Sequence, residues 1–111
     1  MERKDKKALI DAYKQKKGLG GVFLIENTKT GRAMLLPSPD PEGTKNRFAF
    51  ARETHTAMHL SITDWGDGSD FTLTLLDSME LEREWDRKRV KDELAALTEL
   101  WREKLGERLW Y

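Results

Sequence analysis

The sequence predicts a small α+β domain: a three-stranded antiparallel sheet, formed by a β-hairpin plus a third strand, flanked by helices. Two short apolar segments, 22–25 and 33–36, are separated by a turn, as in a hairpin. Residues 71–75 alternate strictly between apolar and polar side chains, which is the period of a strand. Residues 86–105 carry apolar side chains at helical spacing. Because 111 residues is a usual length for one hydrophobic core, we expect a single domain over 1–111.

Composition supports a folded domain. Apolar residues make up 38% of the chain and charged residues 36%, and four Trp, four Phe and two Tyr supply large rings for a core. Cysteine is absent, which excludes disulfides and thiolate metal sites and fits a reducing compartment. The first residues are charged and form no signal peptide, and no apolar run is long enough to span a membrane. These features predict a cytoplasmic protein that does not act at a membrane.

The first element expected is a short helix over residues 5–17. Asp5 can cap its start, Leu9 and Tyr13 stand one turn apart, and Gly18 ends it. Residues 1–17 hold seven basic and three acidic side chains, a charge of +4 in a chain whose net charge is zero. A nucleic-acid binder usually shows a basic face, and only this segment offers one.

The hairpin follows, with strands at 22–25 and 33–36 joined by a turn at 27–31 in which Gly31 can take a positive φ. Three prolines within residues 37–41 end the second strand, because proline lacks a backbone donor and has a fixed φ.

Two helices are expected in the middle of the chain. The first runs from Glu42 to about Glu53, with Phe48 facing the core. The second, over 56–65, is short and is closed by the Gly-Asp-Gly of residues 66–68.

The third strand and the last helix complete the domain. The alternation of residues 71–75 continues through Met79 and Leu81, so a longer strand is an open alternative. The helix over 86–105 has one apolar stripe, made of Val90, Leu94, Leu97, Trp101 and Leu105.

The order of these elements and several motifs resemble the GIY-YIG nuclease superfamily, in particular its small stand-alone bacterial members. The first family motif is similar to Gly21-Val22-Phe23, the linking turn to residues 27–32, and the second motif falls on Met34-Leu35-Leu36. Further matches are Asn46-Arg47-Phe48, His55, Asp64-Trp65 and residues 100–105. The resemblance implies a hairpin, helices, a third strand and a final helix over about residues 5–105.

In that family a divalent metal held by a glutamate hydrolyses DNA, while tyrosines and an arginine position water and stabilise the phosphate. The resemblance places these roles on residues that lack the required groups. The two tyrosines become Phe23 and Met34, the motif glycine becomes Leu36, the arginine becomes Thr44 and the metal glutamate becomes Thr98. Gly21 and Arg47 are what remains of the motif set. The resemblance therefore implies a nuclease-like domain that has lost catalytic activity.

Two alternatives stay open at this stage. One is a divergent nuclease in which Arg47 and Glu99 or Glu103 rebuild the site with magnesium or manganese; otherwise we expect no cofactor. The other is DNA binding without cleavage through Arg47, Arg52 and the basic segment. Residues 40–53 hold equal numbers of basic and acidic side chains, which favours an unknown protein partner over DNA.

Several other groups of residues have a functional and a structural interpretation, and the structural one is expected for each. His55 and His59 have metal-ligand spacing, with Asp64 or Asp67 as a possible third ligand, but no glutamate follows the first histidine as in a metalloprotease helix. Asp67 and Asp70 lack the glutamate that ends a calcium loop. The glycine run 18–21 does not open a helix as a phosphate loop does.

Charge and aromatic clusters complete the set. They are Glu80, Glu82 and Glu84 on one strand face, the basic run 87–89 with Lys91, and the tail Leu109-Trp110-Tyr111. For the basic run, an anion or acidic partner is the alternative, since the start of a helix disfavours positive charge. For the tail, we expect folding back onto the core, with exposure for a partner as the alternative.

Overall fold

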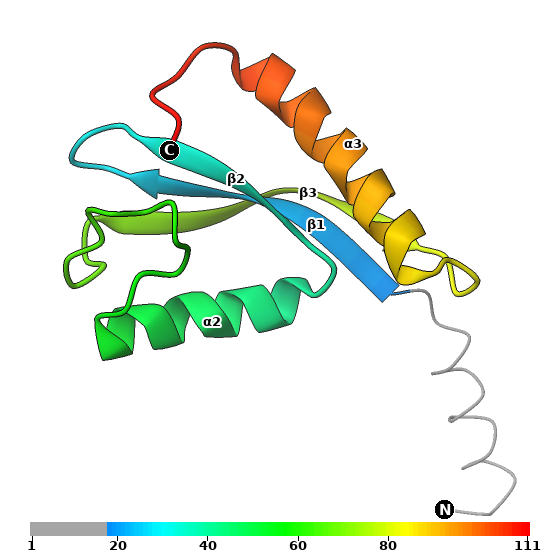
Figure 1. Cartoon of the computed structure of the whole chain (residues 1–111), viewed down its shortest axis with the longest axis horizontal. Helices are drawn as coiled ribbons and strands as arrows, with labels where there is room; N and C mark the ends of the chain where they lie inside the picture. The colour runs from blue at the N-terminus through cyan, green and yellow to red at the C-terminus, as the bar shows by residue number, and fades with distance from the viewer. Residues whose placement is uncertain (1–17) are drawn as a thin grey trace, which may run out of the picture.

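The computed structural model describes residues 18–111. These residues form three strands and two helices (Figure 1). The strands are β1 (Gly18–Asn27), β2 (Ala33–Ser38) and β3 (Phe71–Leu81), and the helices are α2 (Pro41–Thr54) and α3 (Arg87–Leu105). The helix predicted over 5–17 lies outside the described residues. Neither described helix is long and apolar enough to cross a membrane.

The three strands form one antiparallel sheet in the order β2-β1-β3, which confirms the predicted fold class. The hairpin turn has its predicted place, and Gly31 takes a φ of 79° there. In the central strand β1, Phe23 lies opposite Leu36 of β2 and Leu75 of β3. The register with β3 shifts by one residue between Val22 and Phe23, a β-bulge that adds twist to the long strands.

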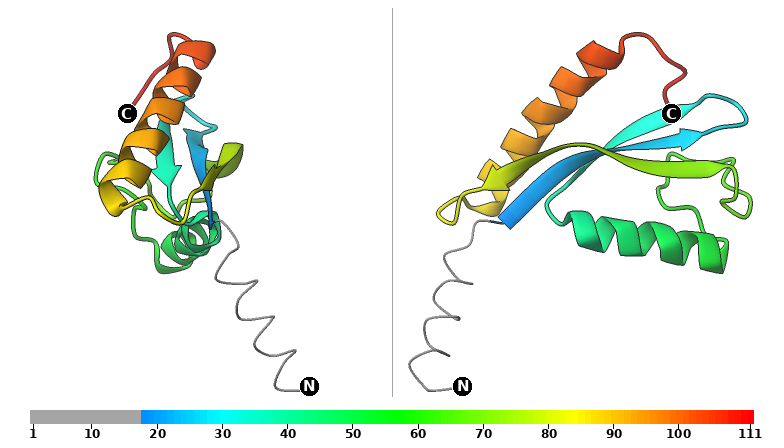
Figure 2. Two further views of the ribbon diagram at one scale, coloured as in Figure 1. Left: turned by 90° about the vertical axis from the view of Figure 1, so that its right-hand side faces the viewer. Right: turned by 180° about the vertical axis from the view of Figure 1, so that it is seen from behind.

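The two helices cover opposite faces of this sheet (Figures 1 and 2). Successive strand residues point to opposite faces. A Cβ built on Gly20 would lie 2.9 Å from Leu94 of α3, whereas one built on Gly21 would lie 3.7 Å from Pro41 of α2. The α2 face therefore carries Gly21 and, by alternation, Phe23 and Ile25.

The main core lies on the α2 face. It contains the buried residues Ile25, Phe48, Ala51, Met58, Ile62, Trp65 and Phe71. The rings of Trp65 and Phe71 are 4.6 Å apart, and Phe48 meets Trp65 edge-on at 5.8 Å. Phe48 is thus the core-facing residue of α2, as predicted, and such ring pairs add stability beyond the area they bury.

The prediction of a second helix in the middle of the chain was wrong, because residues 56–65 form turns and bends. His55 ends α2 in the left-handed conformation with a φ of 56°. The Ser61 backbone N–H then donates to His59 Nδ1 instead of to a helical carbonyl. The apolar spacing that predicted a helix belongs to Met58, Ile62 and Trp65, and all three are buried in the core. A loop can bury side chains at this spacing as well as a helix can.

Strand boundaries also differ from the prediction. β1 begins at Gly18, so the glycine run of residues 18–21 lies within a strand. β2 continues through Pro37 to Ser38 because β2 is an edge strand, where a missing backbone donor is tolerated. β3 extends to Leu81, the longer of the two alternatives.

The C-terminal tail folds back onto the sheet, which confirms the expectation. The Ala33 N–H donates to the Leu109 carbonyl, and the Tyr111 N–H donates to the Ala33 carbonyl, each at 2.9 Å. The Tyr111 ring stacks on Phe71 at 6.2 Å, and the Tyr111 hydroxyl donates to Asp64 Oδ1 at 2.8 Å. The tail thus ties the edge of β2 to the long loop before β3.

This contact makes stability depend on pH in the alkaline range. Burial, together with the hydrogen bond to Asp64, raises the pKa of Tyr111 above its ordinary value of 10.0. The folded state thus favours the neutral phenol, so this stabilisation is complete below about pH 10 and is lost as pH rises through the folded pKa.

We expect Tyr111→Phe to lower the melting temperature near neutral pH, and the gap from the parent to shrink above about pH 10. Thermal melts followed by circular dichroism across this range measure the gap. A gap that stays constant to the highest pH would show that the hydroxyl does not carry the effect.

Candidate functional site

Four of the six motif positions lie on the sheet face that α2 covers, and three of them are packed apolar side chains. Phe23 is only 1% exposed and lies opposite Leu36. Met34 and Leu36 pack against the main core. Gly21 is on the same face, where a Cβ would meet Leu75 Cδ1 at 2.8 Å. This face is therefore filled by hydrocarbon, and these four positions offer no side-chain hydroxyl or charge to a phosphate.

Thr44, at the arginine position, is buried in the first turn of α2. Its hydroxyl lies 2.6 Å from the Ser38 hydroxyl, which also accepts from the backbone N–H of Asp40. Asp40 in turn caps the helix by accepting from the Gly43 N–H at 3.1 Å. The polar atoms at this position thus hold the β2–α2 junction together and carry no positive charge.

Thr98, at the metal-glutamate position, lies on α3 and so on the other face of the sheet from Phe23. Its hydroxyl donates to the Leu94 carbonyl one turn earlier, at 2.7 Å. An uncharged hydroxyl engaged in this way does not fit the role of a carboxylate ligand for magnesium or manganese. The donor set that the family chemistry requires is therefore not assembled by these residues.

The residues proposed to rebuild a site are also held apart. Arg47 is on α2 and Glu99 is on α3, and the two helices cover opposite faces (Figure 2). Arg47 instead lines a groove of about 360 Å³ with Phe50 and Met58. Arg52 donates to the Gly68 carbonyl at 3.1 Å and stacks on Phe48, so this guanidinium supports the loop before β3.

The histidine and aspartate patterns occupy caps and turns. His55 caps α2 through its backbone, and His59 Nδ1 accepts from Ser61. Asp67 Oδ1 accepts from the Ser69 N–H at 2.9 Å, and hydrogen bonds from Ser69 lower the pKa of Asp67 below its ordinary value. Within residues 18–111, no three His, Asp or Glu side chains gather as metal ligands would.

The glutamates do not share one strand face as predicted, because β3 ends at Leu81. Glu80 is in the strand, whereas Glu82 and Glu84 follow it in the turn that leads to α3. Trp85 closes this turn, since its N–H donates to the Glu82 carbonyl at 3.1 Å. The three carboxylates thus line the end of β3 and the connection to the helix.

The basic run at the start of α3 divides into paired and unpaired side chains. Lys88 pairs with Asp92 at 3.2 Å, and Arg89 pairs with Glu93 at 2.9 Å. Arg87 and Lys91 have no carboxylate within salt-bridge distance in the described part of the chain. Both unpaired cations border a groove that sequence reasoning missed.

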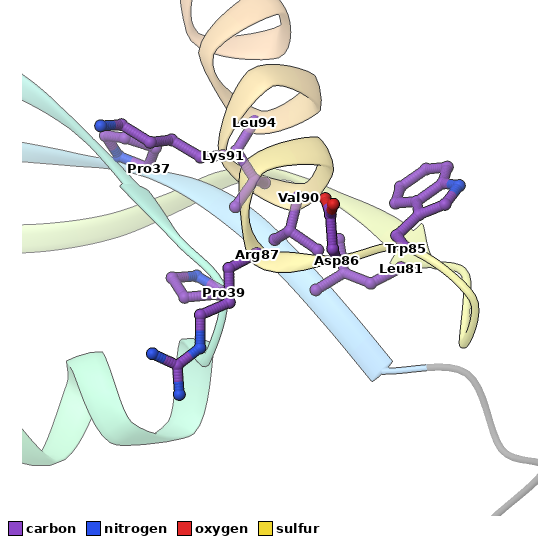
Figure 3. A pocket seen from close by; sticks show the side chains of 9 residues that line it. All are labelled: Pro37, Pro39, Leu81, Trp85, Asp86, Arg87, Val90, Lys91 and Leu94. Atoms are coloured by element: carbon purple, nitrogen blue, oxygen red, sulfur yellow. The ribbon is translucent and has the colours of Figure 1, made fainter.

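This groove lies between the end of β2, the end of β3 and the first half of α3 (Figure 3). It has a volume of about 520 Å³ and is lined by Pro37, Pro39, Leu81, Trp85, Asp86, Arg87, Val90, Lys91 and Leu94. Six of these nine side chains are apolar, and the three charged ones come from the start of α3. The signal in the sequence was a pair of prolines, Pro37 in β2 and Pro39 just after it, and Trp85 just before the N-cap of α3.

No protein-family model matches the chain, and no curated protein or solved structure matches it either.

Proposed function

We propose that this chain is a GIY-YIG-like domain that no longer cleaves DNA and works in the cytoplasm as a binding or regulatory module. Its support is the ordered set of motif-like residues, from Gly21-Val22-Phe23 to residues 100–105, together with an antiparallel sheet in which a hairpin precedes α2, β3 and α3. The absence of cysteine supports the cytoplasmic location.

The observation that carries the loss of activity is the filling of the motif face. A phosphodiester in hydrolysis develops negative charge, which needs fixed donors, a guanidinium or a metal. At these positions the chain has a buried Phe23, the packed Met34 and Leu36, and a Thr44 hydroxyl already engaged with Ser38. A substrate would have to displace core side chains to reach this face.

A protein partner is favoured for the outer side of α2. Phe50 is 66% exposed there, beside Met58 and Arg47 in the smaller groove. Arg47 has no ion pair among residues 18–111. An exposed aromatic ring next to an unpaired guanidinium fits a partner that presents an apolar side chain and a carboxylate. DNA fits less well, because Lys45 already pairs with Glu42 and Arg52 is engaged with the loop before β3.

The test is a nuclease assay on linear and branched DNA with magnesium and with manganese. We expect no cleavage by the folded parent protein, because the required carboxylate and hydroxyls are missing. Arg47→Ala and Glu99→Ala are run beside it. Cleavage by the parent that either variant abolishes would show that a site has been rebuilt, and the proposal would be wrong.

DNA binding without cleavage is tested separately by fluorescence anisotropy on labelled duplex DNA at several salt concentrations. We do not expect the protein to show DNA affinity that falls steeply as the salt concentration rises. A steep dependence of affinity on salt would report contacts with DNA phosphates. Phe50→Ser serves as the control, because it removes the exposed ring without changing charge. Salt-dependent binding that Arg47→Ala weakens would favour DNA as the partner.

A further inference from the structure

β3 is an edge strand whose outer side pairs with no other strand among residues 18–111. The sheet order is β2-β1-β3, so β3 pairs with β1 on one side only. Figure 2 shows β3 at the free side of the sheet, with the two helices on the sheet faces. Such an edge presents a row of backbone donors and acceptors on which another strand can pair.

Backbone alternation identifies the groups that face outward from this edge. The Thr28 N–H donates to the Asp70 carbonyl at 2.9 Å, so Asp70 faces β1. Neighbouring residues of a strand direct their backbone groups to opposite sides, so Thr74 also faces β1, whereas Leu73 and Leu75 face away from it. The outward N–H and carbonyl groups of these two leucines have no hydrogen-bond partner within residues 18–111.

The rest of this edge is protected. At its start, the Phe71 N–H already donates to the Gly68 carbonyl at 3.2 Å. At its other end, a β-bulge follows Leu75, and the Ser78 N–H donates to Asp77 Oδ1 at 2.8 Å. Bulges and charged side chains are common means of preventing edge pairing. The stretch between these two ends carries no charged side chain and is open to a partner strand.

One exposed leucine accompanies the free backbone groups. Leu75 lies opposite Phe23 and is 40% exposed. Leu73 lies opposite Ile25 and packs against the main core. Both leucines are therefore on the α2 face, whereas Thr74 is exposed on the α3 face. An exposed apolar side chain beside unpaired backbone groups is typical of an edge that pairs with another strand.

We propose that β3 of a second copy of this chain pairs antiparallel with this edge, so that two sheets join into one about a two-fold axis at Thr74. In this register Leu73 of one copy lies opposite Leu75 of the other, and the axis generates the same pair again. Each such pair exchanges two backbone hydrogen bonds, which satisfies the outward groups of both leucines. Leu75 is thereby removed from water against the partner's Leu73.

A second copy is favoured over an unrelated strand because the open stretch is complementary to itself. The spacing of the two leucines matches each free N–H with a free carbonyl when the stretch is turned about the axis. Thr74 meets its own equivalent there, and two threonines are compatible neighbours on one sheet face. No charge repulsion opposes the pairing, because residues 71–76 contain no charged side chain. This inference concerns the edge of β3 and does not depend on the function proposed for the α2 face.

Sedimentation velocity between about 1 μM and about 1 mM protein measures the monomer–dimer equilibrium. We expect the parent to dimerise within this range. Thr74→Lys places like charges directly opposite each other at the axis, and it should weaken the dimer at least about tenfold. The matched control is Thr30→Lys, which adds the same charge in the exposed hairpin turn and should dimerise like the parent.

A mixture of Thr74→Lys with Thr74→Glu tests the register itself. Each variant repels its own copy, whereas the mixture places opposite charges at the axis. We therefore expect a heterodimer at concentrations where each variant alone is monomeric. A parent that stays monomeric throughout the range would overturn the proposal and leave the edge to a strand of another protein. A dimer that Thr74→Lys leaves intact, or a mixture that stays monomeric, would also overturn it.

Disulfide trapping is a second measurement that does not depend on charge. The chain has no cysteine, so Thr74→Cys carries a single thiol at the axis. Residues directly opposite each other in a non-hydrogen-bonded antiparallel pair have Cα atoms about 4.5 Å apart, which is within disulfide range. Under mild oxidation we expect Thr74→Cys to form a covalent dimer about tenfold faster than Thr30→Cys. Equal rates would contradict pairing at Thr74, and circular dichroism of the reduced proteins confirms that both are folded.

Discussion

Replacing Phe71 by alanine should lower the free energy of unfolding by about 3–5 kcal/mol, enough to remove much of the stability of a domain this small. Phe71 begins β3, is 0% exposed, and stacks between Trp65 at 4.6 Å and Tyr111 at 6.2 Å. Its ring thus joins the sheet, the long loop and the C-terminal tail. Truncation leaves a cavity that these three parts cannot all close.

The matched control is Phe50→Ala, which removes the same ring from an exposed site on α2. We expect a change within about 0.5 kcal/mol there, because little apolar area returns to water. Urea-induced unfolding followed by circular dichroism gives both values. Equal losses in the two variants would mean that Phe50 is buried by a contact outside the described residues, for example in an oligomer.

The second large effect is expected from Gly21→Ala, which should destabilise the domain by about 1–3 kcal/mol. The added methyl carbon would lie 2.9 Å from the Asp77 carbonyl oxygen and 2.8 Å from Leu75 Cδ1. A leucine side chain can rotate away, but the Asp77 carbonyl belongs to β3 beside the bulge. Relief therefore requires β1 and β3 to separate locally, which weakens the ladder between them.

Gly18→Ala is the control for this substitution. It lies in the same strand, and among residues 18–111 its added carbon would meet only Leu81 atoms, at 3.9 and 4.0 Å, an ordinary contact distance. We expect its unfolding midpoint in urea to stay near that of the parent. A Gly21→Ala variant as stable as Gly18→Ala would show that β3 shifts easily at the bulge.

The Gly21 result also bears on the resemblance to the nuclease family. Gly21 is the glycine that resembles the first family motif, and its close packing against β3 and α2 is by itself a sufficient reason for a glycine there. Three other positions of the motif set, Phe23, Met34 and Leu36, carry apolar side chains that support the same packing. Under the proposed function, the sheet face that would have held the site is packed with core side chains instead.

Local patterns determined much of the fold. The hairpin, the alternating β3 and the amphipathic α3 were predictable because hydrophobic period and turn residues act over a few neighbours in sequence. α2 was predictable for the same reason, and its cap at Asp40 satisfies the first turn. The return of the tail was expected from two terminal aromatics, although its pairing with Ala33 was not.

Long-range packing decided the rest. Met58, Ile62 and Trp65 have the spacing of a helix, yet a loop buries them because α2 and β3 offer the apolar surface around them. The alternative of a divergent nuclease required Arg47 and Glu99 or Glu103 to meet in one site, but the sheet separates their helices. The groove beside α3 exists only where three elements from distant parts of the chain meet. Periodicity reports which residues are buried; which of them share a face depends on tertiary contacts that no local pattern encodes.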